Sequence, residues 1–171
     1  GRNLSYYSEK SYGYSPFYKS GRYPTISLGD NITTISPYLF YGNINLTSIN
    51  IPKGVTSIGE RAFYNCSSLY KVFNSSNLSL SKNSTSNSYV AYYAIVLYQG
   101  GNLTAVGDFQ FYTSDGIHLL VNYIGYDTEI VLPDSYNGEN YKIGDCAFSG
   151  CSSLTTITIP EGVTSIESYA F

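Results

Sequence analysis

The chain has 171 residues, enough for one domain of ordinary size with a substantial core. Charged residues make up only 12% of it and the formal net charge is −3, so nine scattered Lys and Arg argue against nucleic-acid binding. A hydrophobic fraction of 43% and 20 tyrosines exclude a disordered composition, and the most apolar run, Tyr89 to Tyr98, is too short to span a membrane.

The first segment, residues 1–22, contains the start of a series of phenylalanines that recurs along the chain. Phe17, Phe40 and Phe63 follow one another at steps of 23 residues, and Phe171 follows Phe148 at the same step. A fixed period of this length is typical of a repeat architecture, in which each unit buries its apolar face against its neighbours. All five phenylalanines are therefore predicted to form one interior stack.

The next two segments are copies of one unit. Residues 23–45 form a weaker copy, and Leu46 to Leu69, LTSINIPKGVTSIGERAFYNCSSL, form a clear one. In the clear copy, residues 46–51 predict a strand, Pro52 to Gly54 a break, and residues 55–58 a second short extended segment. The spacing of Ala62, Phe63 and Cys66 predicts a single helical turn that points the phenylalanine inward.

The segment from 69 to 126 departs from the repeat. Leu69 to Asn74 begins another strand in register, but the I-P step is missing and a polar stretch follows. Apolar residues at helical spacing then predict a helix over 88–98, although the aromatic and β-branched content also permits a strand. Residues 108–113 and 117–124 flank Ser114-Asp115-Gly116, which predicts a hairpin.

The repeat resumes at Thr128 with EIVLP in place of SINIP. Four extra residues around Asn137-Gly138 predict the tip of a surface hairpin. The final copy, LTTITIPEGVTSIESYAF from Leu154, repeats the copy from Leu46 in register.

The shared pattern L-x-x-I-x-I-P-x-x-V-T-S-I-x-x-x-A-F-x-x-C resembles the BspA-type leucine-rich repeat, over residues 20–68 and 127–171. The resemblance implies a right-handed, β-rich repeat solenoid with short helical turns, an extracellular or cell-surface location, and adhesion or protein recognition. We expect repeats in residues 1–74, an insertion in 75–126, and repeats again in 127–171. The first and last repeats are incomplete, so we expect further repeats on both sides.

Little in the sequence points to catalysis. His118 is the single histidine, and no nucleophile, P-loop or metal-protease motif accompanies it. Cys66, Cys146 and Cys151 are an odd number without metal-ligand spacing, and are expected to be free thiols in the repeat core. We therefore expect no enzyme activity, cofactor or metal.

The outward positions of the repeat strands are the candidate binding site, because alternate strand residues share one face. Their side chains are small and mostly polar, which suits a broad protein surface, such as a host matrix or surface protein, better than a small-molecule pocket. A passive spacer is one alternative, and carbohydrate binding by Tyr6, Tyr7, Tyr12, Tyr14 and Tyr18 is another. The candidate partner-binding residues are Thr25, Ser27, Ser48, Asn50, Glu129, Val131, Thr156 and Thr158.

Overall fold

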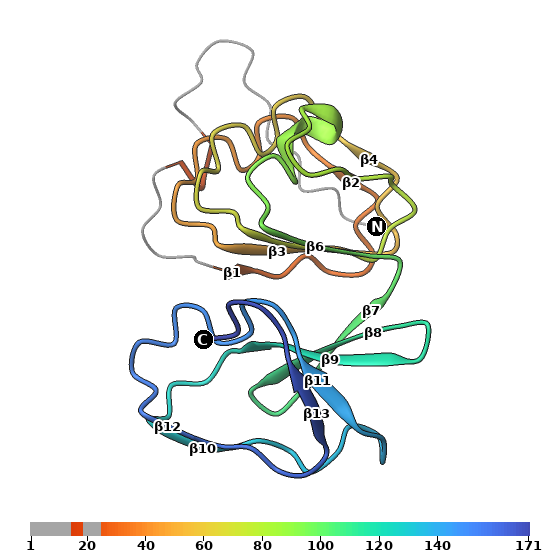
Figure 1. Ribbon diagram of the computed structural model, residues 1–171. Coiled ribbons are helices and arrows are strands. Elements are labelled where there is room, and N and C mark those ends of the chain that lie inside the picture. The colour runs from red at the N-terminus through yellow and green to blue at the C-terminus, as the bar shows by residue number, and fades with distance from the viewer. Residues whose placement is uncertain (1–14, 19–24) are drawn as a thin grey trace. The chain divides into compact units, whose positions relative to one another are not determined.

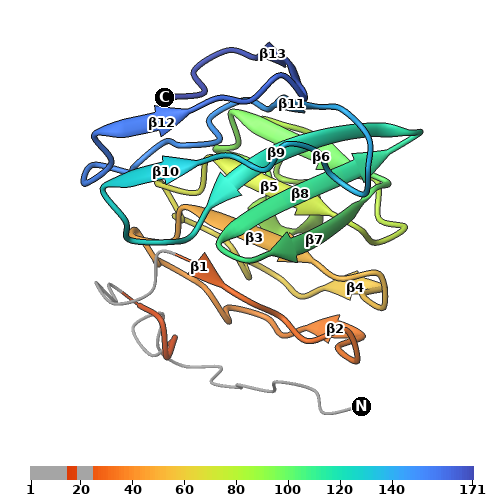
Figure 2. The ribbon, with the colours of Figure 1, turned by 90° about the horizontal axis from the view of Figure 1, so that it is seen from below.

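A computed structural model describes residues 15–18 and 25–171 (Figures 1 and 2). In these residues there are thirteen short strands and a single 3₁₀ helix, so the expected β-rich repeat solenoid is confirmed. The chain divides into two compact units, residues 1–100 and 101–171, and each is described by itself. Across the described residues, no helix has the length and apolarity that a membrane crossing requires.

The first unit is built from parallel strands, each contributed by a successive coil of the chain. One sheet has the order β1-β3-β5-β6, and a second, two-stranded sheet pairs β2 with β4. Within the first sheet the register aligns Thr25 with Ser48, Ser48 with Lys71, and Lys71 with Val96. Each coil therefore adds one strand after 23 or 25 residues. The bounds are β1 Thr25–Ile26, β2 Thr34–Ile35, β3 Ser48–Ile51, β4 Ser57–Ile58, β5 Lys71–Asn74 and β6 Val96–Gln99.

The segment around each repeat phenylalanine is a series of tight turns, so the predicted helical turn is wrong. The backbone N–H of Ala62 donates to Gly59 O at 3.2 Å and that of Cys66 to Phe63 O at 3.2 Å. Between them, Arg61 (φ 51°) and Asn65 (φ 60°) adopt left-handed backbone conformations that interrupt a right-handed helix. The position two residues before the phenylalanine is also left-handed in three other copies, at Tyr38, Cys146 and Tyr169.

The phenylalanine column forms the centre of the first unit's core. The rings of Phe17 and Phe40 lie 5.2 Å apart, and those of Phe40 and Phe63 lie 5.0 Å apart. Phe40 and Phe63 are fully buried together with Leu46 and Ile49, so consecutive coils share one continuous apolar interior. This part of the predicted stack is confirmed.

The predicted helix over 88–98 is wrong. Only the 3₁₀ helix η1, Ser86–Tyr89, is present there, and Asn87 and Ser88 within it have left-handed conformations. Residues 96–99 instead form β6, the fourth strand of the repeat sheet, which lies in the segment expected to be an insertion. The physical reason is the open edge of β5: the N–H groups of Ile95 and Val96 donate to Tyr70 O at 2.8 and 2.9 Å, which a helix could not do.

The second unit combines an antiparallel hairpin with further parallel coils. Its five-stranded sheet has the order β13-β11-β9-β8-β7, in which β7, β8 and β9 are antiparallel and β9, β11 and β13 are parallel. Strands β10 and β12 form a separate parallel pair. The bounds are β7 Asn102–Val106, β8 Phe109–Ser114, β9 Ile117–Tyr123, β10 Glu129–Val131, β11 Tyr141–Ile143, β12 Thr156–Thr158 and β13 Val163–Ile166.

Both predicted hairpins of this unit are confirmed. Between β8 and β9, Asp115 (φ 50°) and Gly116 (φ 75°) form the turn. At the second tip, Asn137 (φ 53°) and Gly138 (φ 79°) lie between Tyr136 and Glu139, which pair as an antiparallel bridge. Two consecutive left-handed residues are what a two-residue hairpin of type I′ requires, and Asn-Gly and Asp-Gly provide them at low cost.

The phenylalanine column of the second unit is only partly interior. The ring of Phe148 stacks on that of Phe171 at 5.2 Å with an interplanar angle of 4°, and lies 6.3 Å from Tyr123. Phe148 is buried, whereas Phe171 is 63% exposed even though Phe148 covers one face of its ring. The prediction that Phe171 is interior is wrong.

Candidate functional site

In the second unit, the predicted strand-face residues form one compact exposed patch. Glu129 lies opposite Thr156 and Val131 opposite Thr158 in the parallel register of β10 and β12. All four side chains are exposed, and Val131, at 67%, is the large apolar member of the patch. The alternation of outward and inward residues places Ile130 and Ile157 on the opposite, core-facing side.

In the first unit, the structure brings only part of the predicted strand face to the surface. Thr25 and Ser27 are exposed and Asn50 is half-buried, whereas Ser48 retains only 6% of its exposure. Asn50 also has a polar neighbour, since the Ser75 hydroxyl donates to its Oδ1 at 3.5 Å. Ser48 is therefore a poor contact residue for a partner.

The aligned outward positions of β1 and β3 continue across the sheet into β5 and β6, two strands from which no candidate residue was predicted. Ser48 aligns with Lys71, and Asn50 aligns with Phe73, which in turn aligns with Tyr98. The rings of Phe73 and Tyr98 stack at 5.2 Å, and Lys71 and Phe73 are both buried. Adding the 23-residue step to Ser48 and Asn50 would have found Lys71 and Phe73, so these rows are not uniformly small and polar.

A second surface feature, which we call the tyrosine ladder, consists of Tyr18, Tyr41, Tyr64, Tyr89, Tyr92 and Tyr93. Its first three members each follow a phenylalanine of the core column by one residue. Ring centroids are 6.5 Å apart between Tyr18 and Tyr41 and 5.4 Å apart between Tyr41 and Tyr64, with interplanar angles of 23° and 15°. The repeat therefore stacks these rings in line, just outside the phenylalanine column.

Ring geometry changes at the η1 end of the ladder. Tyr64 and Tyr89 lie 5.0 Å apart with an interplanar angle of 87°, and Tyr92 and Tyr93 lie 4.9 Å apart at 85°. In such pairs the edge of one ring meets the face of the other, whereas the parallel pairs use faces on both rings. Tyr64 and Tyr93 are each 39% exposed, so part of both residues at this end is accessible to solvent.

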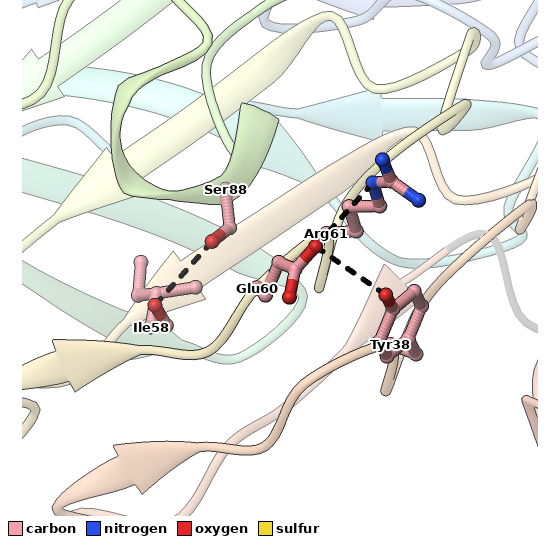
Figure 3. Close-up of polar contacts among 5 residues, drawn as sticks. All are labelled: Tyr38, Ile58, Glu60, Arg61 and Ser88. Atoms are coloured by element: carbon pink, nitrogen blue, oxygen red, sulfur yellow. Dashed lines mark hydrogen bonds and ion pairs between the residues drawn. The ribbon is translucent and has the colours of Figure 1, made fainter. Parts of the chain in front are cut away.

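An ion pair lies beside the ladder (Figure 3). Arg61 Nε is 3.7 Å from Glu60 Oε1, and the Tyr38 hydroxyl donates to the same carboxylate oxygen at 3.4 Å. The Arg61 guanidinium carbon also lies 5.9 Å from the centre of the Tyr64 ring, a cation–π distance. Nearby, the Ser88 hydroxyl donates to Ile58 O at 3.4 Å and joins the η1 segment to β4.

The ladder was only partly accessible to sequence reasoning. Of the five tyrosines proposed for carbohydrate binding, Tyr6, Tyr7, Tyr12 and Tyr14 lie outside the described residues, and Tyr18 is a ladder member. The dipeptide Phe-Tyr at 17–18, 40–41 and 63–64 was a usable signal for the first three rings. Tyr89 breaks the 23-residue step, so its place in the ladder required the structure.

The single histidine joins two segments of the second unit. His118 Nδ1 is 3.0 Å from Thr113 Oγ1, and His118 Nε2 is 3.1 Å from Glu139 Oε2. A hydroxyl, an imidazole and a carboxylate in this order resemble a catalytic relay. However, the His118 side chain is only 12% exposed and its ring packs 5.0 Å from that of Tyr136. The arrangement is suited to holding the β8–β9 hairpin against the Asn137-Gly138 tip.

The cysteines are free, as predicted. The Cys66 thiol donates to Phe40 O of the preceding coil at 3.1 Å, and burial raises its pKa to about 12. A thiol held in its protonated form is a poor nucleophile and a poor metal ligand. In the described part of the chain, no group of three or more His, Cys, Asp and Glu side chains is placed to hold a metal ion.

Comparison with known proteins gives one strong match. The family described as "BspA type Leucine rich repeat region" matches residues 10–121 and 126–171 in six copies. A search of curated proteins finds no significant match.

Two solved structures are similar to the chain at low identity. A leucine rich cell surface protein from Faecalibacterium prausnitzii is 20% identical over 92% of this chain, with a TM-score of 0.39. A leucine-rich repeat protein from Eubacterium ventriosum is 19% identical over 99% of it, with a TM-score of 0.35. The chain spans 41% and 56% of the lengths of those two chains.

Proposed function

Because the chain belongs to the BspA-type leucine-rich repeat family, we propose that it is a non-catalytic recognition module at the cell surface or in the extracellular space. The partner is a protein, such as a host matrix or surface protein, and the contact surface is the strand face of the repeats. The observation that carries this proposal is the exposed patch of Glu129, Val131, Thr156 and Thr158.

The patch has the properties of a shallow protein-binding surface. Two strands in register place an acidic, an apolar and two hydroxyl-bearing side chains next to one another, so both hydrogen bonding and apolar contact are available. Val131 would be desolvated on binding, which supports affinity. Binding by one such patch is expected to be weak, because Trp, Tyr and Arg usually dominate protein interfaces and none is among these four residues.

Repetition would compensate for the weak contact of each patch. Linked sites bind with an effective concentration that raises the overall affinity without any new contact. Binding by an array of such repeats is therefore expected to fall steeply as repeats are deleted. A shallow dependence on repeat number would argue for a single site elsewhere.

The test is a binding screen against immobilised collagens, laminins and other matrix proteins, followed by substitution of the patch. Each of the four residues is changed to lysine in one variant, and we expect the loss of binding to any protein that the wild type binds, with an unchanged melting temperature. A variant with Thr104→Lys and Val106→Lys, both exposed on the edge strand β7, tests whether lysine on an exposed strand is by itself enough to disturb binding. Undiminished binding by the patch variant would exclude the strand face of the second unit, whose patch carries the proposal.

A passive spacer is the second candidate. The small hydroxyl side chains of Thr25, Ser27, Thr156 and Thr158 favour it, because such residues rarely dominate binding energy. A spacer would bind none of the immobilised proteins, while deletion of repeats would still shorten the distance that the protein spans.

A further inference from the structure

We propose that the tyrosine ladder of the first unit is a second binding surface and that its ligand is a neutral polysaccharide. The surface comprises the six ladder tyrosines together with Glu60 and Arg61. It differs from the strand face in location and in ligand class, so the two proposals stand or fall separately.

The spacing of the rings is the first argument. Successive centroids from Tyr41 to Tyr93 lie between 4.9 and 5.7 Å apart, a step comparable to the length of one sugar unit in an extended glycan. Each step brings a new ring and a new phenolic hydroxyl, which can both donate and accept a hydrogen bond. A chain of similar sugars could therefore meet similar groups at successive positions.

The ladder is also pre-organised. Each ring packs against a neighbouring ring, and the backbone behind the ladder is tied between coils by hydrogen bonds from Phe40 N–H to Ala62 O and from Gly42 N–H to Tyr64 O, both 2.9 Å. Tyrosine has few rotatable bonds, and packing reduces its freedom before any ligand arrives. Little side-chain entropy is then lost on binding, which favours a ligand that offers only weak contacts at each unit.

The mixed ring geometry provides the groups that a sugar needs. The parallel rings of Tyr18, Tyr41 and Tyr64 leave mainly edges and hydroxyls for contact, whereas the perpendicular rings from Tyr89 to Tyr93 leave more ring face. Sugars have apolar C–H faces that pack on aromatic rings and hydroxyls at their edges. The η1 end is therefore the place for stacking, and the remaining ladder supplies hydrogen bonds.

Charge argues for a neutral ligand. In the three loops that carry the ladder beyond Tyr18, residues 36–43, 59–66 and 84–94, the only charged residues are Glu60 and Arg61. These two form an ion pair, so the three loops themselves carry no net charge. Lys82, two residues before the third loop, donates to Ile95 O at 3.1 Å, and the loops hold no cluster of cations of the kind that attracts a sulfated or phosphorylated polymer. Their exposed groups can still accept and donate hydrogen bonds to sugar hydroxyls.

The test uses the whole chain and four soluble neutral polysaccharides: amylose, mixed-linkage β-glucan, xyloglucan and mannan. Retardation in native gels that contain each polymer gives the affinity, and the fluorescence of the 20 tyrosines, which no tryptophan obscures, provides a second readout of binding. We expect at least one of the polymers to bind, with an affinity that 0.5 M NaCl leaves unchanged. Binding of heparin in place of all four would overturn the proposal, as would binding of none of them.

The matched variants separate the ladder from tyrosine in general. Tyr64→Ala with Tyr93→Ala is expected to weaken binding by about tenfold or more, a loss typical of aromatic anchors. Tyr126→Ala with Tyr169→Ala removes two tyrosines that are 92% and 79% exposed in the second unit, and is expected to bind like the wild type. Equal losses in the two double variants would refute the assignment to the ladder.

Two further variants separate loss of binding from loss of folding, and the ladder from the strand face. Tyr93→Ala alone changes one exposed ring and, with an unaltered melting curve, should still weaken binding severalfold; full retention would count against the proposal. The strand-face lysine variant should bind the polysaccharide normally, because its changes lie in the second unit. Loss of polysaccharide binding in that folded variant would contradict a site on the ladder.

Discussion

Two copies of the repeat that share 12 of 18 residues, Leu46–Phe63 and Leu154–Phe171, have very different environments. In the first copy the apolar residues are almost completely buried: Leu46, Ile51 and Phe63 have no exposed surface. At the equivalent positions of the second copy, Leu154 is half-buried, Ile159 is 43% exposed and Phe171 is 63% exposed. The same motif therefore forms core in one place and surface in the other.

The difference follows from the number of neighbouring coils. Among the described residues, strand β3 of the first copy pairs on both sides, with β1 and β5, whereas β12 of the second copy pairs on one side, with β10. A hollow of about 360 Å³ accordingly opens beside Phe148, Leu154 and Phe171. In a repeat protein the interface between coils supplies much of the stability, so the burial of a coil depends on how many coils pack against it.

The largest effect is expected for the phenylalanine column. Phe63→Ala should lower the free energy of unfolding by about 3 to 5 kcal/mol, because the ring is fully buried and packs 5.0 Å from the ring of Phe40. Phe171→Ala should cost about 1 kcal/mol or less, because most of its ring is already in water. Urea unfolding followed by circular dichroism measures both, and equal losses would show that the two copies have equivalent environments.

The strand isoleucines should show the same contrast at lower magnitude. Ile51→Ala is expected to cost about 2 to 4 kcal/mol, and Ile159→Ala under about 1 kcal/mol. Each isoleucine is followed directly by the proline that ends its strand segment, so the two substitutions are matched in chemistry and in position within the repeat. Denaturant midpoints of the two variants, measured at one pH and temperature, provide the comparison.

Alkaline pH should distinguish the two cysteines at the equivalent position, Cys66 and Cys151. Burial raises the pKa of Cys66 from its ordinary value of 9.0 to about 12, so its thiol stays protonated in the folded chain while the unfolded chain loses the proton. Its contribution to stability is complete below pH 9 and is lost as the pH rises from 9 to about 12, at about 1.4 kcal/mol per pH unit within that window.

The measurement compares the pH dependence of unfolding in Cys66→Ala and Cys151→Ala. In Cys66→Ala the free energy of unfolding should decrease less steeply above pH 9 than in the wild type. In Cys151→Ala, which removes a half-buried thiol, the slope should change less. The comparison between variants cancels the titration of the many tyrosines. An identical alkaline profile in wild type and Cys66→Ala would contradict the raised pKa.

The smallest expected difference, the order in which the three cysteines react with a thiol reagent, can be measured on the wild-type protein. In the native protein at neutral pH, a thiol reagent should modify Cys151, which lines the open hollow, before it reaches the buried Cys66 and Cys146. Mass spectrometry of the labelled peptides gives the order. After unfolding without reductant, all three thiols should react, and recovery of a single thiol would indicate a disulfide.

Short-range features of this chain were determined by the sequence itself. The 23-residue step predicted the strands, the phenylalanine contacts within each unit and the equivalent positions of Cys66 and Cys151. Asn137-Gly138 and Asp115-Gly116 predicted their hairpins, because left-handed backbone at two successive residues favours these side chains locally. The protein partner and the strand-face site remain predictions.

Only the tertiary structure decided the features that depend on neighbouring coils. Residues 96–99 have a sequence compatible with helix or strand, and the unpaired edge of β5 selected the strand. Ser48 and Thr156 stand at equivalent positions, yet one is buried and the other exposed. Burial and strand pairing depend on contacts between residues far apart in sequence, so the repeat pattern specifies which face of a strand a residue occupies but not what covers that face.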